Sequence, residues 1–144
     1  MSEKRHLTRT AVYVVLEKEG KAFFLRRANT GWADGMLTVP AGHVDEGEGV
    51  SEAAVKEVKE ETGVTVDIND LDFIHVDYIK DEYVNFYFKA VKWNGEPVAL
   101  EQDKSSEGVW FSIDDLPDDM VPQLRNMFAR TKSEKLFSDI DRKI

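Results

Sequence analysis

Residues 42–64 of the chain read GHVDEGEGVSEAAVKEVKEETGV, and the rest of the sequence is interpreted outward from this stretch. Its first part is polar and contains three glycines, a composition typical of a loop. Its second part, residues 50–62, holds only residues that favour or tolerate a helix, and Gly63 follows as a C-terminal stop. The pattern predicts a loop that leads directly into a helix over residues 50–62.

The predicted helix carries carboxylates on the face that should be buried. At about 100° per residue, Glu61 projects along the same line as Val50 and Ala54. Glu57 lies beside this line, and Glu60 is close enough along the helix for all three carboxylates to converge. Like charges at this spacing destabilise a helix, and at its C-terminal end they oppose the helix dipole. Two interpretations remain open: a solvated acidic face, or a site where carboxylate oxygens bind Mg²⁺ or Mn²⁺.

The loop before the helix favours the second interpretation. Gly42, Gly47 and Gly49 allow the backbone to approach a ligand closely. Residues 45–61 contain seven acidic side chains and two lysines, which gives a local charge of −5. Such a charge repels a bare polyphosphate, so polyphosphate can bind here only together with divalent cations.

Composition narrows the class of protein. With 144 residues, of which 42% are hydrophobic and 33% charged, the chain is expected to form one soluble domain over residues 1–144. A net charge of −9 disfavours duplex nucleic acid and anionic membrane surfaces as partners. The absence of Cys excludes disulfides, a thiolate metal site and a Cys nucleophile. No apolar run is long enough to cross a membrane and no secretory signal is present at the start, so we expect a cytoplasmic protein.

The rest of the chain indicates a mixed α/β fold. A second, amphipathic helix is expected over 119–130, a single helical turn over 112–116, and a charged tail that frays from about residue 133. β-Branched and aromatic runs predict strands over residues 10–16, 22–25, 36–40, 71–79, 83–93 and 108–111.

Residues 42–64 resemble the Nudix box. That pattern is Gly, five residues, Glu, seven residues, then Arg-Glu-apolar-any-Glu-Glu-any-Gly-apolar, and it is highly specific. Every fixed position matches except the arginine, which is Lys56 here. The lead-in VPAGHVDEGE is also similar to MutT-like members of the family, although Ala41 stands where many relatives have a second glycine. The resemblance covers most of the chain and implies the Nudix-type α/β/α sandwich with a mixed sheet, a central catalytic helix and a C-terminal helix.

The resemblance also implies a set of site residues. The box glutamates and the Gly42 carbonyl would bind Mg²⁺ or Mn²⁺, with Glu107 as a late acid facing the metal and Glu101 as the alternative. Glu48 would be structural and paired with Lys56, which keeps the charge of arginine but loses its forked geometry. Glu57 is the first choice for the general base, and a carboxylate from a later loop is the alternative. The catalytic set expected from the box is Glu57, Glu60 and Glu61.

The implied reaction is attack of water on phosphorus in a nucleoside diphosphate linked to another group. In MutT-like relatives an arginine at the end of the second strand contacts phosphate. Arg26 and Arg27 occupy that strand end and should point to opposite faces, so one of them is expected to reach the substrate. Trp32 either stacks on a base or packs against the fold. Modified or ordinary nucleoside triphosphates, cleaved to monophosphate and pyrophosphate, are the expected substrates.

Three alternatives stay open at this stage. The first is a pyrophosphatase of sugar nucleotides, dinucleotides or capped RNA, and the second is a module that senses nucleotides without turnover. The third is an acidic scaffold protein, in which Glu60→Gln would change neither activity nor metal affinity. A homodimer is possible because dimers are common in the family, although no residue of the sequence establishes one.

Overall fold

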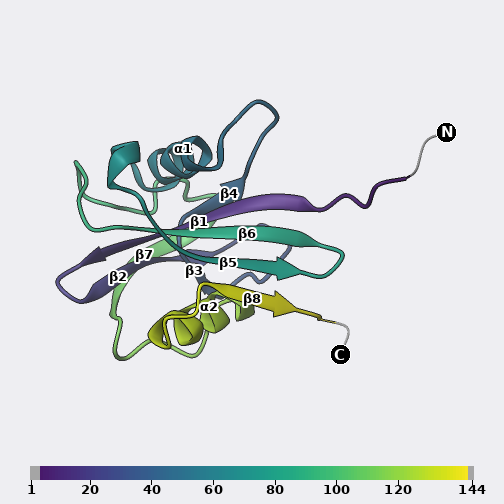
Figure 1. Cartoon of the computed structure of the whole chain (residues 1–144). Helices are drawn as coiled ribbons and strands as arrows, with labels where there is room; N and C mark the ends of the chain where they lie inside the picture. Colours follow the sequence, from purple (N-terminus) through teal and green to yellow (C-terminus); the bar gives the residue numbers. More distant parts are fainter. Residues whose placement is uncertain (1–3, 143–144) are drawn as a thin grey trace.

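The structure is a computed structural model that describes residues 4–142. It has an α/β/α arrangement in which a mixed sheet separates two helices (Figure 1). The strands are β1 (Arg9–Lys18), β2 (Lys21–Arg27), β3 (Leu37–Thr38), β4 (Ala41–His43), β5 (Asp72–Ile79), β6 (Tyr83–Ala90), β7 (Ser105–Ser112) and β8 (Phe137–Ile140). The helices are α1 (Val50–Thr62), the short 3₁₀ helix η1 (Ile68–Asp70) and α2 (Pro122–Lys132).

The sheet is ordered β3-β2-β1-β6-β5-β8, with β4 pairing to β1 and β7 pairing to β2. The β1–β6 and β5–β8 pairs are parallel, and the other pairs are antiparallel. Helices α1 and α2 lie on opposite sides of the sheet (Figure 1). This architecture confirms the predicted fold class.

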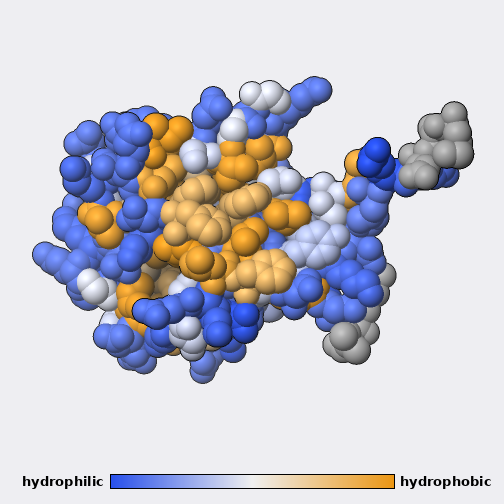
Figure 2. Space-filling view, in the orientation of Figure 1, coloured by the Kyte–Doolittle hydropathy of each residue, from blue (hydrophilic) through white to orange (hydrophobic). Residues whose placement is uncertain are grey.

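Each face of the sheet has its own hydrophobic core. Along β1, Val12, Val14 and Leu16 belong to the core under α1, whereas Val15 faces the core under α2. Because both faces of this strand are covered, its sequence is a continuous apolar run instead of an alternation of apolar and polar residues. Apolar side chains form a band across the middle of the molecule at the height of the sheet, with polar side chains above and below (Figure 2). The outer surfaces of the two helical layers are therefore the polar ones.

The predicted helix over residues 50–62 coincides with α1, and the predicted strands all appear. Three expectations are wrong. The helical turn expected over 112–116 is absent, because Ser112 ends β7 and residues 113–115 form a turn and a bend. The strand expected over 83–93 ends at Ala90. The tail does not fray up to residue 142, because β8 pairs in parallel with β5. In addition, β4 forms within the region expected to be loop.

None of the helices within residues 4–142 is long and apolar enough to span a membrane. The first three and last two residues of the predicted domain, 1–3 and 143–144, lie outside the described residues.

Candidate active site

Helix α1 begins and ends where its sequence predicts. Glu52 Oε1 accepts a hydrogen bond of 2.9 Å from the backbone N–H of Gly49, which caps the first turn. Gly63 follows the last turn with a φ of 83°, the left-handed conformation that glycine adopts without strain. The N–H of Gly63 closes the helix on the carbonyl of Lys59 at 3.0 Å. The positions of the acidic side chains are therefore fixed by a helix that is capped at both ends.

The C-terminal half of α1 lies against β4, and two of the three box glutamates contact it there. A Cβ atom at position 42 would overlap the Glu57 carboxylate, so this carboxylate occupies the space that only a glycine leaves open. Glu61 Oε2 accepts a hydrogen bond of 2.9 Å from the backbone N–H of Ala41. Strand β4 therefore holds both carboxylates, which is why its short pairing with β1 matters for the site.

Both of these carboxylates are harder to ionise than an ordinary glutamate. Burial, with a smaller contribution from the neighbouring charge of Glu60, raises the pKa of Glu57 to about 7. Burial raises the pKa of Glu61 to about 8, against the lowering effect of the bond from Ala41. Desolvated carboxylates crowded in this way need a positive charge nearby to be stable as anions.

A late acid also acts on this cluster. The charge of Glu101 contributes to the raised pKa of both Glu57 and Glu61. The backbone explains its position, because the N–H of Leu100 donates to the carbonyl of Glu61 at 2.9 Å. The loop that carries Glu101 is thus tied directly to the end of α1.

The other late acid has a different neighbour. Glu107 lies opposite Arg26 across the β2–β7 pair, and its Oε1 is 3.4 Å from Arg26 Nε. The Arg26 guanidinium also donates to the Gly35 carbonyl and to Asp119 Oδ2, each at 2.9 Å. Glu107 therefore pairs with Arg26, and Arg26 also bonds to Gly35 and Asp119. The charges of Glu107 and Arg26 compensate each other.

The loop before α1 is anchored by charge. Lys56 Nζ lies 3.0 Å from Glu48 Oε2 and 2.9 Å from Asp45 Oδ2. Glu48 Oε1 also accepts from the backbone N–H of Asp45 at 2.8 Å, and this bond together with Lys56 lowers the pKa of Glu48. One ammonium group thus bridges two carboxylates where a forked arginine would form paired bonds.

The donor set fits a hard divalent cation in its chemistry. Glu57, Glu60 and Glu61 offer carboxylate oxygens, the ligands that a hard cation prefers, and the charge of a neighbouring glutamate raises the pKa of both Glu57 and Glu61. Within residues 4–142 no group of three His, Asp or Glu is placed to hold a metal ion. Glu60 itself is exposed on the helix surface.

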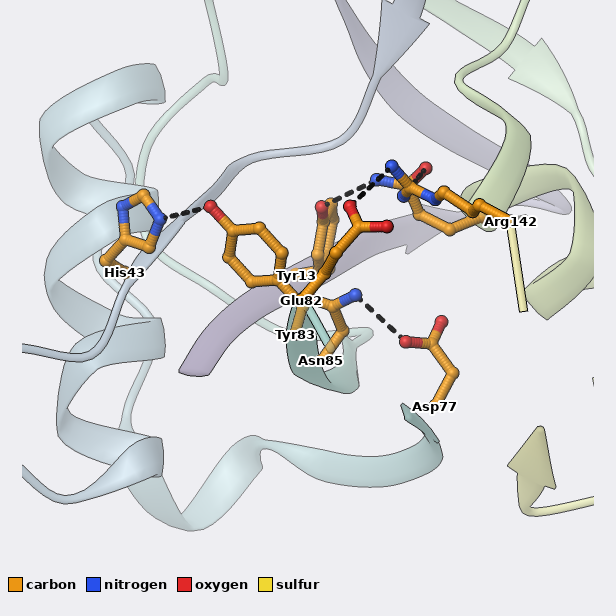
Figure 3. Close-up of polar contacts among 8 residues, drawn as sticks. Tyr13, His43, Asp77, Glu82, Tyr83, Asn85 and Arg142 are labelled. Atoms are coloured by element: carbon orange, nitrogen blue, oxygen red, sulfur yellow. Dashed lines mark hydrogen bonds and ion pairs between the residues drawn. The ribbon is translucent and has the colours of Figure 1, made fainter. Parts of the chain in front are cut away.

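A cavity of about 500 Å³ is lined by β4 together with residues of β1 and β6. Arg27 lines it, and the Arg27 guanidinium lies 4.8 Å from the centre of the Trp32 ring, to whose backbone carbonyl its Nε donates at 2.8 Å. His43 and the Tyr83 hydroxyl share a hydrogen bond of 2.8 Å at the rim (Figure 3). The lining residues are Arg9, Ala11, Tyr13, Arg27, Trp32, Ala41, Gly42, His43, Glu82, Tyr83, Asn85, Gln123 and Arg142.

The structure thus separates the two candidate arginines, as their opposite directions on β2 require. Arg27 and Trp32 line the cavity that also contains Gly42, whereas Arg26 does not. Sequence reasoning missed the cavity floor, formed by Tyr13, Asn85 and Gln123. A signal was present in the strands, because polar residues at alternate positions of an otherwise apolar strand project to one face.

Known proteins resemble this chain in sequence and in fold. A family model described as the NUDIX domain matches residues 6–131. An "8-oxo-dGTP diphosphatase" of Escherichia coli is 30% identical over 125 residues, which span 85% of this chain and 94% of that protein. An "ADP-ribose pyrophosphatase" of Methanocaldococcus jannaschii is 31% identical over 110 residues, which span 74% of this chain and 63% of that protein. A crystal structure of a MutT NUDIX hydrolase from Burkholderia pseudomallei matches with a TM-score of 0.78 and 26% identity, covering 85% of this chain and 97% of that one.

Proposed function

The chain belongs to the NUDIX domain family and hydrolyses phosphoric anhydride bonds, and from this premise we propose that it cleaves nucleoside triphosphates to a monophosphate and pyrophosphate. Oxidised or otherwise modified purine forms are included among the proposed substrates. The relative that matches over nearly its whole length, the diphosphatase of Escherichia coli, acts on such a nucleotide according to its name.

The observation that carries the proposal is the position of the cavity relative to the acidic helix. Gly42 belongs to both: it lines the cavity, and the Glu57 carboxylate lies against it. A volume of about 500 Å³ is in the range of small-molecule sites. A nucleoside in the cavity would therefore extend its phosphates past β4 toward the carboxylates of α1.

The metal belongs to this proposal. Glu57, Glu60 and Glu61, with the Gly42 carbonyl, would hold Mg²⁺ or Mn²⁺, which neutralises phosphate charge and lowers the pKa of bound water. Of the two late acids we assign Glu101 to this group in place of Glu107, because its charge acts on Glu57 and Glu61 whereas Glu107 is paired with Arg26. Binding of the cation would remove the repulsion that now opposes ionisation of Glu57 and Glu61.

The chain's own groups complete the reaction. Glu57 is proposed as the base that accepts a proton from the attacking water, because its carboxylate lies against Gly42, which lines the cavity. Arg27 is the proposed phosphate contact, because it lines the cavity beside Gly42. Trp32, which packs against Arg27, supplies an aromatic wall for the nucleoside.

A hydrolysis panel with product analysis tests the proposal. It contains natural and oxidised nucleoside triphosphates, ADP-ribose, a dinucleotide and NAD-capped RNA, each with Mg²⁺, with Mn²⁺ and with a chelator. Glu60→Gln serves as the blank, and the exposed Glu46→Gln serves as the control for loss of one loop carboxylate. We expect monophosphate and pyrophosphate from triphosphates, with turnover lowered about 100-fold or more in Glu60→Gln only.

Other outcomes would redirect the assignment. Turnover of ADP-ribose or the dinucleotide alone would contradict the triphosphate proposal within the same enzyme class. Nucleotide binding without turnover of any compound would indicate a sensing module.

A further inference from the structure

The cavity contains a hydrogen-bonding group with no partner. Asn85 lines the cavity from β6 and is only 1% exposed. Its Oδ1 is the one buried side-chain nitrogen or oxygen within residues 4–142 that lacks a hydrogen-bond partner. Buried polar groups are almost always paired, so an unpaired acceptor at the floor of a cavity points to a donor that arrives with a ligand.

The orientation of the Asn85 amide is fixed from below. Asn85 Nδ2 donates to Asp77 Oδ1 at 2.9 Å, and the Tyr87 hydroxyl donates to Asp77 Oδ2 at 2.7 Å. A carboxylate only accepts hydrogen bonds, so the amide nitrogen must face Asp77 and the amide oxygen must face away from it. Asp77 is fully buried and does not line the cavity, whereas Asn85 does, and the Asn85 amide nitrogen points to Asp77 (Figure 3).

A hydrogen-bond donor, the Tyr13 hydroxyl, lines the same cavity. Arg142 Nη2 donates to Gln123 Oε1 at 3.3 Å, which fixes the Gln123 amide so that its Nε2 donates to the Tyr13 hydroxyl at 3.1 Å. The Tyr13 oxygen therefore accepts, and its own proton is left to donate. In the parallel β1–β6 pair Asn85 is opposite Ala11, and Tyr13 lies two residues further along β1 on the same face of the sheet, opposite Tyr87. Both Asn85 and Tyr13 line the cavity.

We propose that Asn85 and Tyr13 determine base specificity: they bind a purine whose pairing edge presents an N–H donor beside an acceptor. Asn85 Oδ1 accepts from the N–H and the Tyr13 hydroxyl donates to the adjacent acceptor. Asp77 is a positioning residue, because it acts only by orienting Asn85. The proposal rests on the proposed function, since it assigns the base-binding part of the same site.

The test compares two triphosphates that differ at this edge. Inosine triphosphate has an N–H next to a carbonyl oxygen, whereas purine riboside triphosphate has neither. An unsatisfied buried acceptor costs binding by about 5- to 150-fold, so the wild-type kcat/KM ratio should favour inosine triphosphate by about tenfold or more. Asn85→Leu, which keeps the side-chain size, should bring the ratio close to one, mainly through KM. Asn69→Leu, on the exposed η1, is the matched control and should leave the ratio unchanged.

A second variant, Asp77→Asn, should reverse the preference between the two triphosphates. A purely structural role of Asn85 would not produce this reversal. In Asp77→Asn the Tyr87 hydroxyl keeps the new amide oxygen on its side, so the new amide nitrogen faces Asn85. The Asn85 amide should then turn and present its NH₂ group to the cavity. We expect the ratio to fall below one, in favour of purine riboside triphosphate, whose ring nitrogen accepts.

The outcomes separate the two proposals. If wild type hydrolyses both triphosphates equally, or if Asn85→Leu keeps the wild-type ratio, base recognition by Asn85 is overturned while triphosphate hydrolysis stands. If Asn85→Leu does not fold, an unchanged ratio in Asp77→Asn overturns it instead. If wild type hydrolyses no triphosphate, the proposed function fails, and calorimetric binding of inosine against purine riboside decides on Asn85: equal affinities overturn the inference.

Discussion

At the scale of single residues, the site depends on a side chain that is missing. Gly42 has no Cβ, and the Glu57 carboxylate fills the space where one would be. Gly42→Ala should displace this carboxylate, and a shift of about 1 Å in a catalytic group can cost about 100-fold in rate. We expect kcat to fall by that order while the protein stays folded.

The control for Gly42→Ala is Gly20→Ala in the β1–β2 turn. A methyl group at Gly20 meets nothing within 4 Å, but its φ of 76° strains any other residue. This control should lower stability by about 1–2 kcal/mol and leave kcat unchanged. Kinetics and thermal unfolding of both variants check the prediction, and an unaffected kcat in Gly42→Ala would show that Glu57 does not act in the position seen here.

Some of the candidate site residues could be predicted from the sequence, and others could not. The box glutamates and Lys56 could be proposed as site residues from the sequence, because they belong to a local pattern with fixed spacing. Such a pattern can be recognised without knowledge of the fold. The preference for Glu107 over Glu101 could not be checked in the same way. Only the β2–β7 register shows that Glu107 lies opposite Arg26, and only the bond from Leu100 to Glu61 brings Glu101 to the helix.

At the scale of elements, α1 carries an electrostatic cost in the metal-free protein. Folding raises the pKa of Glu57 to about 7 and of Glu61 to about 8, from an ordinary value of 4.5. At pH values between the unfolded and the folded pKa, the folded state binds more protons than the unfolded state. The free energy of unfolding therefore falls as pH rises from about 5 to about 8. We expect the urea midpoint of the chelator-treated protein to fall over this interval, and Glu61→Gln to flatten the profile.

Cation binding should oppose this trend. A divalent cation that binds only the folded protein stabilises it by mass action, and it binds more tightly once the carboxylates are ionised. The stabilisation by Mg²⁺ or Mn²⁺ should therefore grow with pH in wild type. Glu46→Gln, on the exposed loop, should behave as wild type does. A pH profile that is the same in wild type and Glu61→Gln would contradict the burial of this carboxylate.

The elements that the sequence did not predict share a physical origin. Strands β4 and β8 are short, and each exists because it pairs with a longer strand, β1 or β5, far away in the sequence. Local propensity and periodicity contain no term for such pairing, so three residues of β4 read as loop and four of β8 as tail. Helix α1 was predictable because its caps and its hydrogen bonds are local.

At the scale of the whole molecule, the proposed metal site and the cavity proposed for the base meet at β4. The acidic helix lies on one side of the sheet, and most of the cavity wall comes from residues on the other. Strand β8 belongs to the cavity side: Ser138 bonds to His75 at 2.8 Å and to Asn126 at 2.9 Å, and Arg142 beyond it reaches the cavity. The NUDIX domain match ends at residue 131, before this strand begins.

Removal of residues 136–144 should therefore weaken the cavity side of the sheet more than the side that carries α1. It exposes the edge of β5, leaves the buried His75 without its Ser138 partner and removes Arg142 from the cavity, so we expect lower stability and weaker nucleotide binding. Ser138→Ala is the milder companion, with a loss of about 1–3 kcal/mol and Arg142 retained. Mn²⁺ binding, measured by paramagnetic relaxation without nucleotide, should stay as in wild type in both, because α1 and β4 are untouched. A truncated protein that binds nucleotide normally but has lost Mn²⁺ would show that the metal and base sites are arranged differently from this assignment.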